Sequence, residues 1–270
     1  MTDYFERTFG HMDGRVAVVT GASSGIGASI ARAFLDAGAR VHAVARRGDA
    51  MREQLGADAI ADGRCVLHPA DVSDRDEMVA FGAHLAENDP IDTLVCAAGF
   101  NIPKRRVAEL TPDSWDELVA VNLSGVFYLL HATLDQLRER QGDFVAISSV
   151  SATWPDHAGA AYGATKSGLL GFARGLGIDE HGNGVRVTSV LPGIIDTPIL
   201  DRRPIPPTPE LREWIAKPDD VAQAILTAVT LPARVNIAEM TIVSTRLQSL
   251  GKTQEANPQL PLSLRESRSE

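Results

Sequence analysis

The 270-residue chain is poor in several kinds of residue, and each shortage argues against a class of protein. It has two cysteines, Cys65 and Cys96, and neither stands in a Cys-x-x-Cys or Cys/His pattern. The sequence therefore predicts neither a disulfide scaffold nor a metal site. Basic residues are outnumbered, with 26 Lys and Arg against 35 Asp and Glu, for a net charge of −9. Such a surface repels polyanions, so nucleic acid is not expected as a partner.

Long apolar runs are also missing. No stretch reaches 18 apolar residues, and the least charged segment, 118–134, is interrupted by Asn122, Ser124, Gly125 and His131. We therefore predict no membrane-spanning segment. Residues 1–14 mix acidic and basic side chains without the apolar run of a secretory signal. A reducing cytoplasmic location fits these features best.

What the chain does contain is an alternation of short apolar runs with longer amphipathic stretches, which is the pattern of βαβ units. Helices are expected to start near Ile26, Asp74, Asp113, Ala160 and Asp219, with Ser73 and Thr111 as N-caps and Gly38 as a C-cap. The Val, Ile and Ala content of the apolar runs indicates strands buried on both faces of a parallel sheet. The predicted strands are 16–20, 40–45, 64–67, 91–96, 143–149, 185–191 and 239–243.

This alternation predicts a doubly wound α/β fold of the Rossmann type, with seven parallel strands and helices on both faces. We expect residues 1–14 to be an N-terminal arm, 15–246 to be a single dinucleotide-binding catalytic domain, and 247–270 to be a polar C-terminal tail. Within the domain, the segment 198–218 holds six prolines. Residues 197–218 are therefore predicted to form a substrate loop with a short helix near 210–215.

A glycine-rich turn follows the first predicted strand and opens the first predicted helix. Glycines let a ligand approach the backbone, and the free N–H groups at a helix N-terminus favour an anion such as a pyrophosphate. A ligand-free tight turn would use the same residue types, but the position inside a βαβ unit favours a dinucleotide site. The predicted contacts are Gly21, Ser23, Ser24, Gly25, Ile26 and Gly27.

The end of the second strand bears on the choice of cofactor. In NAD sites an acidic residue there binds the ribose hydroxyls, whereas this chain reads Arg46-Arg47. Two guanidinium groups can hold a 2′-phosphate, so the sequence favours NADP(H), with NAD(H) possible. A solvated charge pair at a helix entry is the alternative.

Two further strand ends carry candidate cofactor contacts. Asp71 and Val72 follow the third strand, where a carboxylate and an apolar side chain could meet an adenine, although Asp71 could equally cap a turn. The fourth strand ends in Cys96-Ala97-Ala98-Gly99, and the three small residues after the cysteine let a ribose come close to the backbone. Cys96 itself is interpreted as a packing residue, because no basic neighbour in sequence would lower its pKa.

Tyr162 and Lys166 lie four residues apart in a predicted helix, so they share one face. An ammonium group near a phenol stabilises the phenolate, which prepares the tyrosine for proton transfer. The chain has only four lysines, and one of them stands inside an Ala- and Gly-rich helix, which favours a function for it. A surface charge on that helix is the alternative interpretation.

Two polar residues complete the candidate chemistry. Ser149 ends the fifth predicted strand, at the carboxyl edge where doubly wound folds bind ligands, and its hydroxyl could donate to a carbonyl oxygen. By residue type Ser148 and Ser151 are similar candidates, but Ser148 should point to the opposite side of the strand. Asn122 lies within a long helical segment, where we expect a local kink that holds a water, or else a satisfied core amide.

Together these residues resemble the classical short-chain dehydrogenase/reductase (SDR) family over residues 12–244. The matching motifs are Thr20-Gly21-x-x-x-Gly25-x-Gly27, Asp71-Val72, Asn122, Ser149, Tyr162-x-x-x-Lys166 and Pro192-Gly193. The resemblance implies a catalytic tetrad in which Tyr162 is the general acid and base, Ser149 orients the carbonyl, Lys166 supports the tyrosine and the nicotinamide ribose, and Asn122 supports a proton-relay water. It also implies nicotinamide contacts at Ile195 and Thr197, and a homotetramer or dimer.

The chain departs from the family at Cys96, where Asn is usual, so a bracing contact of that side chain is in doubt. We expect an NADP(H)- or NAD(H)-dependent oxidoreductase that interconverts a carbonyl and an alcohol. Its substrate pocket would use Ser151, Trp154, His157 and the 198–218 segment. The alternatives are a non-catalytic dinucleotide sensor, which would not need the tyrosine and lysine pair, and an epimerase or dehydratase, for which His157 is the nearest extra acid or base.

Overall fold

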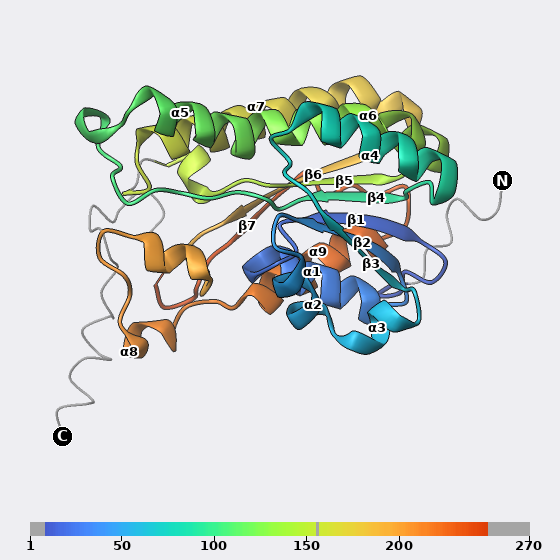
Figure 1. Cartoon of the computed structure of the whole chain (residues 1–270), viewed down its shortest axis with the longest axis horizontal. Helices are drawn as coiled ribbons and strands as arrows, with labels where there is room; N and C mark the ends of the chain where they lie inside the picture. The colour runs from blue at the N-terminus through green and yellow to red at the C-terminus, as the bar shows by residue number, and fades with distance from the viewer. Residues whose placement is uncertain (1–8, 155–156, 248–270) are drawn as a thin grey trace.

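Seven parallel strands form one sheet in the order β3-β2-β1-β4-β5-β6-β7 (Figure 1). The structure is a computed structural model that describes residues 9–154 and 157–247. The order reverses between β1 and β4, as the doubly wound prediction requires. The strands are β1 (Val16–Thr20), β2 (Arg40–Ala45), β3 (Cys65–Pro69), β4 (Thr93–Cys96), β5 (Asp143–Ile147), β6 (Arg186–Pro192) and β7 (Glu239–Ile242).

Burial differs between the middle and the edges of this sheet. Every residue of β4, β5 and β6 is buried, as expected for strands covered on both faces. The prediction of burial on both faces is wrong for β7, which alternates between exposed and half-buried residues, and largely wrong for β3. Both are edge strands with a neighbour on one side only, so less of each is covered.

Two layers of helices cover the sheet, with α4, α5, α6 and α7 on one face and α1, α2, α3 and α9 on the other (Figure 1). Leu129, Leu169 and Phe144 belong to the core on the first face, and Ile30, Phe34 and Ile225 to the core on the second. The helices are α1 (Gly25–Asp36), α2 (Gly48–Leu55), α3 (Ala57–Ala61), α4 (Arg75–Asn88), α5 (Pro112–Val119), α6 (Gly125–Arg140), α7 (Ala160–Glu180), α8 (Pro209–Arg212) and α9 (Pro218–Thr230).

The helix ends confirm one predicted cap and correct two. Thr111 caps α5 by accepting a hydrogen bond from the N–H of Ser114. Asp74, and not Ser73, caps α4, because its carboxylate accepts from the N–H of Glu77. The C-cap of α1 is Ala37, and Gly38 follows it at φ +95°, where glycine is favoured.

Residues Pro112–Arg140 form an almost continuous helical stretch of 29 residues, in which an 18-residue window reaches a mean hydropathy of 1.4. By length and composition this stretch could cross a membrane, contrary to the sequence-based expectation of no such segment. In the structure Val126, Leu129 and Leu137 are buried in the core between the sheet and its helices. Part of its apolar surface is therefore used in packing within the fold.

The proline-rich segment between β6 and α9 folds over one end of the sheet. It contains a short 3-10 helix (Pro198–Arg202) and α8, which is shorter than the predicted 210–215 helix and begins one residue earlier. Arg212 and Lys217 both pair with Asp196 and fix the segment to the chain that follows β6. Leu247, expected at the start of the tail, is buried here against Leu200 and other apolar residues of the segment. The rest of the predicted tail, and residues 1–8 of the predicted arm, lie outside the described residues.

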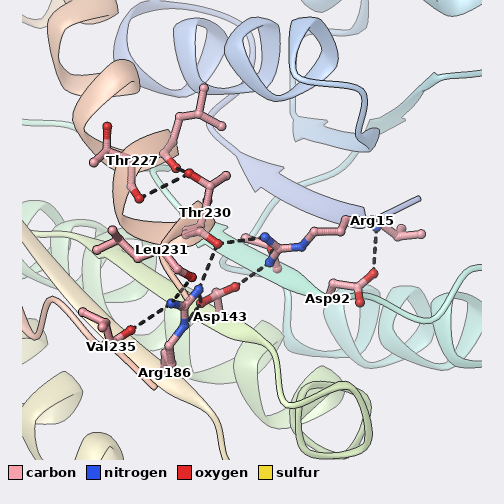
Figure 2. Close-up of polar contacts among 12 residues, drawn as sticks. Arg15, Asp92, Asp143, Arg186, Thr227, Thr230, Leu231 and Val235 are labelled. Carbon is pink, nitrogen blue, oxygen red and sulfur yellow. Dashed lines mark hydrogen bonds and ion pairs between the residues drawn. The ribbon is translucent and has the colours of Figure 1, made fainter. Parts of the chain in front are cut away.

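The amino edge of the sheet holds a buried network of charges (Figure 2). Asp143, the first residue of β5, accepts hydrogen bonds from Arg15 at 2.5 Å and from Arg186 at 2.6 Å. Both guanidinium groups also donate to the backbone oxygen of Val229 at the end of α9. The network connects β1, β5, β6 and α9. It lies at the opposite end of the strands from the carboxyl edge of the sheet.

Candidate active site

A cavity of about 560 Å³ lies along the carboxyl edge of the sheet. Its walls come from the segments that follow β1 to β6, from α7 and from the proline-rich segment. The predicted substrate residues Ser151, Trp154 and His157 line it, together with part of the 198–218 segment. All of the predicted cofactor contacts line it as well: Gly21, Ser23, Ser24, Gly25, Ile26, Gly27, Arg46, Arg47, Asp71, Val72, Ala97, Ala98, Gly99, Tyr162, Lys166, Pro192, Gly193, Ile195 and Thr197.

The glycine-rich turn is packed closely against neighbouring backbone at the start of α1. A Cβ added at Gly21 would lie 2.8 Å from the backbone oxygen of Ala97, and one at Gly27 would lie 2.5 Å from the oxygen of Gly21. Larger residues would therefore displace the turn. Ser24 is the N-cap of α1 but makes no side-chain capping bond, so it leaves N–H groups of the first turn available. These residues fit the pyrophosphate of a dinucleotide.

Two arginines stand at the rim of this part of the cavity. Arg47 donates to the hydroxyl of Ser23 at 3.2 Å and reaches that of Ser24 at 3.5 Å. Arg46 lies 3.8 Å from the carboxylate of Asp71 and its side chain is 66% exposed. Guanidinium and hydroxyl donors are thus grouped at the end of β2, where a ribose 2′-phosphate would require them.

Asp71 is hydrogen-bonded within the chain after β3, and Cys96 is packed in the core. Burial opposes ionisation of Asp71, but hydrogen bonds from the N–H and hydroxyl of Ser73, with Arg46 nearby, hold its pKa below the usual range. Burial raises the pKa of the Cys96 thiol to about 12, so it stays protonated and acts as a packing residue. The backbone after β4 is braced by Thr20, whose hydroxyl accepts from the N–H groups of Ala97 and Ala98 at 3.0 Å.

Tyr162 and Lys166 occupy one face of α7 and point toward the same cavity. Lys166 Nζ lies 5.7 Å from the centre of the Tyr162 ring. The i, i+4 spacing accounts for this, since residues four apart are neighbours on a helix surface. The sequence-based expectation that the two side chains work from the same side is therefore met by the geometry.

The ammonium group of Lys166 is almost completely buried. It donates to the backbone oxygen of Ile147 at 2.8 Å, and burial lowers the pKa of this lysine to about 8. Gly99 lies beside this ammonium group. A Cβ added at Gly99 would lie 3.3 Å from Nζ, so the absence of a side chain leaves space next to the ammonium group. A buried cation with so few partners strongly favours negative charge next to it.

Ser149 follows β5 in an extended conformation and caps a short 3-10 helix (Val150–Ala152). Its Oγ accepts from the N–H of Ser151 and lies 3.1 Å from the Ser151 hydroxyl, which orients the group at the cavity wall. Ser148 donates instead to the backbone oxygen of Lys166, as the alternation of strand side chains predicted. The Ser148 hydroxyl is thus bonded to the backbone of α7, whereas the Ser149 hydroxyl bonds to another side chain of the cavity wall.

Asn122 is fully buried behind the cavity and does not line it. It lies in a π-helical turn (Ala120–Ser124) between α5 and α6, so the helical segment is irregular where the kink was predicted. Its amide exchanges two hydrogen bonds of 3.0 Å with the backbone of Phe100 and donates to Thr165 at 3.3 Å. Asn122 therefore connects the chain after β4 to α7, the helix that carries Tyr162 and Lys166.

Asn101 and Arg105 are among the lining residues that were missed in the sequence. Asn101 donates to the backbone oxygen of Ala158 at 2.9 Å, just ahead of α7. Arg105 donates to Ile102, to His157 and to Arg202 through their backbone oxygens, and so joins three segments around the mouth of the cavity. Their position soon after a strand end was the available signal, but backbone acceptors leave no pattern in a sequence.

The family comparison is decisive. A family model described as short chain dehydrogenase matches residues 15–205. The chain belongs to this family. Members of it are oxidoreductases that use a nicotinamide dinucleotide, and this short-chain dehydrogenase is accordingly an NAD(P)-dependent oxidoreductase. An uncharacterized oxidoreductase of Staphylococcus haemolyticus is 34% identical over 233 residues, which cover 86% of this chain and 97% of the relative.

Solved structures give the same result. A 3-ketoacyl-(acyl-carrier-protein) reductase from Brucella melitensis, complexed with NADH, superposes on this short-chain dehydrogenase with a TM-score of 0.76 at 26% identity, covering 87% of this chain and 98% of the other. An alcohol dehydrogenase from Thermococcus sibiricus, complexed with 5-hydroxy-NADP, has a TM-score of 0.73 at 30% identity, covering 86% and 97%. Both structures contain a nicotinamide dinucleotide: the first contains NADH and the second contains 5-hydroxy-NADP.

Proposed function

We propose that this enzyme interconverts a ketone or aldehyde with the corresponding alcohol, with Tyr162 as the acid and base. The observation that carries the proposal is Lys166 Nζ, buried 5.7 Å from the centre of the Tyr162 ring within the cavity that the glycine-rich turn opens into. The bound nicotinamide would supply or accept the hydride at the carbonyl carbon. The chain's own residues position the substrate and move the proton.

In the reductive direction, the Tyr162 hydroxyl gives its proton to the carbonyl oxygen as negative charge develops there. Ser149 donates a hydrogen bond to the same oxygen and fixes its direction. The nearby ammonium of Lys166 stabilises the phenolate that remains. Asn122, through Phe100 and Thr165, is proposed to hold α7 in register with the chain after β4.

Substitution of the tyrosine tests this proposal. Tyr162→Phe should lower kcat by about 10³-fold, because general acid–base catalysis contributes about 10² to 10⁴. Cofactor affinity, measured by quenching of protein fluorescence, should stay close to that of the wild type. Reduction of a panel of ketones and aldehydes by NADPH is the activity measurement. If Tyr162→Phe keeps its activity, the tyrosine has no part in the mechanism.

For the cofactor, we propose a preference for NADP(H) that rests on Arg46 and Arg47. The two residues directly after β2 are arginines and not a carboxylate, and Arg47 already donates to Ser23. A charge-assisted hydrogen bond contributes about 1.5 to 3 kcal/mol, so Arg46→Ala and Arg47→Ala should each weaken NADP(H) about tenfold or more relative to NAD(H). Arg52→Ala, on the exposed side of α2, is the matched control. Equal losses for the two cofactors would contradict the preference.

We also propose a homo-oligomer in the cytoplasm. Trp115 on α5 and Phe127 on α6 are 42% and 49% exposed. Phe127 stacks with His131 and makes edge-to-face contacts with Tyr128 and Phe172. An aromatic cluster on the outer helices is a suitable contact surface between subunits. Light scattering should give the mass of a tetramer or dimer, and Phe127→Glu should reduce it. A monomer at micromolar concentration would contradict the proposal.

A further inference from the structure

The charged side chains that line the cavity are almost all positive, although the chain as a whole is acidic. The lining includes six Arg and Lys side chains, namely Arg46, Arg47, Arg105, Lys166, Arg202 and Arg203. Asp71 is the single carboxylate among the described lining residues, and it lies next to Arg46 at the adenine end. The chain as a whole has a net charge of −9. The cavity therefore selects for anions more strongly than the surface around it.

Binding and reaction of a dinucleotide would use only three of these six cations. Arg46 and Arg47 stand at the end of β2 beside Ser23, and Lys166 lies by the Tyr162 ring. The other three are grouped elsewhere. Arg105 donates at 3.3 Å to the backbone oxygen of Arg202, and at 3.4 Å to that of His157, five residues before Tyr162. Arg105 and Arg202 are thus in contact near the segment that leads into α7, and Arg203, the next residue in the chain, lines the same cavity.

The structure holds this group in place. Arg105 Nε donates to the oxygen of Ile102 at 2.7 Å, and a Cβ at Gly159 would lie 2.7 Å from the backbone oxygen of Arg105, so the two segments are in close contact. Arg202 ends the 3-10 helix Pro198–Arg202, and the neighbouring Asp201 is paired with Arg212. Within the described part of the chain Arg202 makes no ion pair. Arg202 is an exposed residue that lines the cavity.

From these observations we infer that the substrate is a carbonyl compound, or its alcohol, that carries an anionic group, a carboxylate or a phosphate, bound by Arg202 with Arg105 and Arg203. The inference rests on the proposed function and specifies its substrate class. A guanidinium group binds either anion through two parallel N–H···O bonds, which fixes direction as well as distance. Binding the anion at the mouth would direct the carbonyl toward Tyr162 and Ser149.

Matched substrates test the inference. Reduction by NADPH is measured for acetoacetate against methyl acetoacetate, and for dihydroxyacetone phosphate against dihydroxyacetone, which separates carboxylate from phosphate. We expect kcat/KM to favour the anionic member of at least one pair by about tenfold or more. Arg202→Gln should reduce that ratio about tenfold and Arg202→Lys should restore part of it, whereas Arg234→Gln, an exposed arginine outside the cavity, should leave it unchanged. Ratios at or below one for both pairs would overturn the inference while leaving the proposed reaction intact.

Binding provides an independent measurement that does not need turnover. Calorimetry with NADP⁺-loaded protein should show acetoacetate or dihydroxyacetone phosphate binding more tightly than its neutral partner, with an affinity that falls as salt is raised. Arg202→Gln should weaken the anion and leave NADP⁺ binding in place. If the variant weakens NADP⁺ as much as the anion, the arginine serves the cofactor and the inference is wrong. If neither anion binds more tightly than its neutral partner, the inference is likewise overturned, whether or not the protein is active.

Discussion

The two edges of the sheet bury charge in opposite ways. At the amino edge, Asp143 lies between Arg15 and Arg186, and backbone oxygens of α9 and of the chain after it accept further hydrogen bonds from the two guanidinium groups (Figure 2). At the carboxyl edge, the buried ammonium group of Lys166 donates to the backbone oxygen of Ile147, and among the described residues no carboxylate pairs with it. The first arrangement neutralises its charges within the fold, and the second leaves a cation that a reacting group can use. Compensated charge supports stability, whereas uncompensated charge supports chemistry at the expense of stability.

Removing the uncompensated cation, Lys166, is expected to have the largest effect. Lys166→Met keeps the length of the side chain and should lower kcat by about 10³-fold, because the phenolate loses its partner. The melting temperature should stay the same or rise, since a buried ammonium group is costly to desolvate. Steady-state kinetics and thermal unfolding measure the two effects, with Lys104→Met, on the exposed chain after β4, as the control. A large drop in melting temperature would show that Lys166 is structural.

At the amino edge the opposite result is expected. Asp143→Asn keeps the size of the side chain but leaves Arg15 and Arg186 without their shared carboxylate. Breaking a buried ion pair in this way should lower the free energy of unfolding by about 4 kcal/mol, measured by urea denaturation. The kcat of the folded fraction should change little. Asp135→Asn, which removes an exposed partner of Arg138, should cost under about 1 kcal/mol and serves as the control.

The pH dependence of stability sharpens the same contrast. Burial lowers the pKa of Lys166 from 10.5 to about 8, so between these values the unfolded chain binds a proton that the folded chain has released. Stability therefore rises with pH across this interval, by about 3 kcal/mol in full. Below pH 8 both states are protonated and the contribution is constant. Urea denaturation of the cofactor-free protein from pH 7 to about 10 should show this rise in the wild type relative to Lys166→Met. Parallel curves for the two proteins would mean that the lysine is not perturbed.

Much of the carboxyl edge was predictable because its signals are local. The strands are short runs of Val, Ile and Ala, and the predicted ranges for β1 and β2 are those of the structure. The Tyr162–Lys166 pair follows from helix spacing alone. The π-helical turn at Asn122 was partly predictable, because an amide inside an apolar helix indicates a local irregularity.

The rest depends on contacts between distant segments. Arg105 meets His157 and Arg202 through backbone oxygens that every residue possesses, so no residue type marks them. The charges of Arg15 and Asp143 were not paired from the sequence, because 128 positions separate them and only the sheet order brings them together. Helices α2 and α3 were missed because they bury little: Met51 and Leu55 are the buried residues of α2, and α3 has none. Neither helix forms a core of its own.

The smallest expected effect shows that charge at the carboxyl edge is not uniformly functional. Asp74 stands next to the cavity segment Ala70–Val72 in sequence, yet its carboxylate is used to cap α4 through the N–H of Glu77 at 2.9 Å. Asp74→Ala should therefore lower the free energy of unfolding by about 1 kcal/mol and leave kcat unchanged. Ser73→Ala is the matched variant, because that hydroxyl bonds to Asp71 and not to the helix, and it tests the cap that the sequence suggested. Urea denaturation of the two variants should rank Asp74→Ala as the less stable. If Ser73→Ala is the less stable variant, Ser73 is the residue that caps α4. If Asp74→Ala lowers kcat, the Asp74 carboxylate takes part in the reaction.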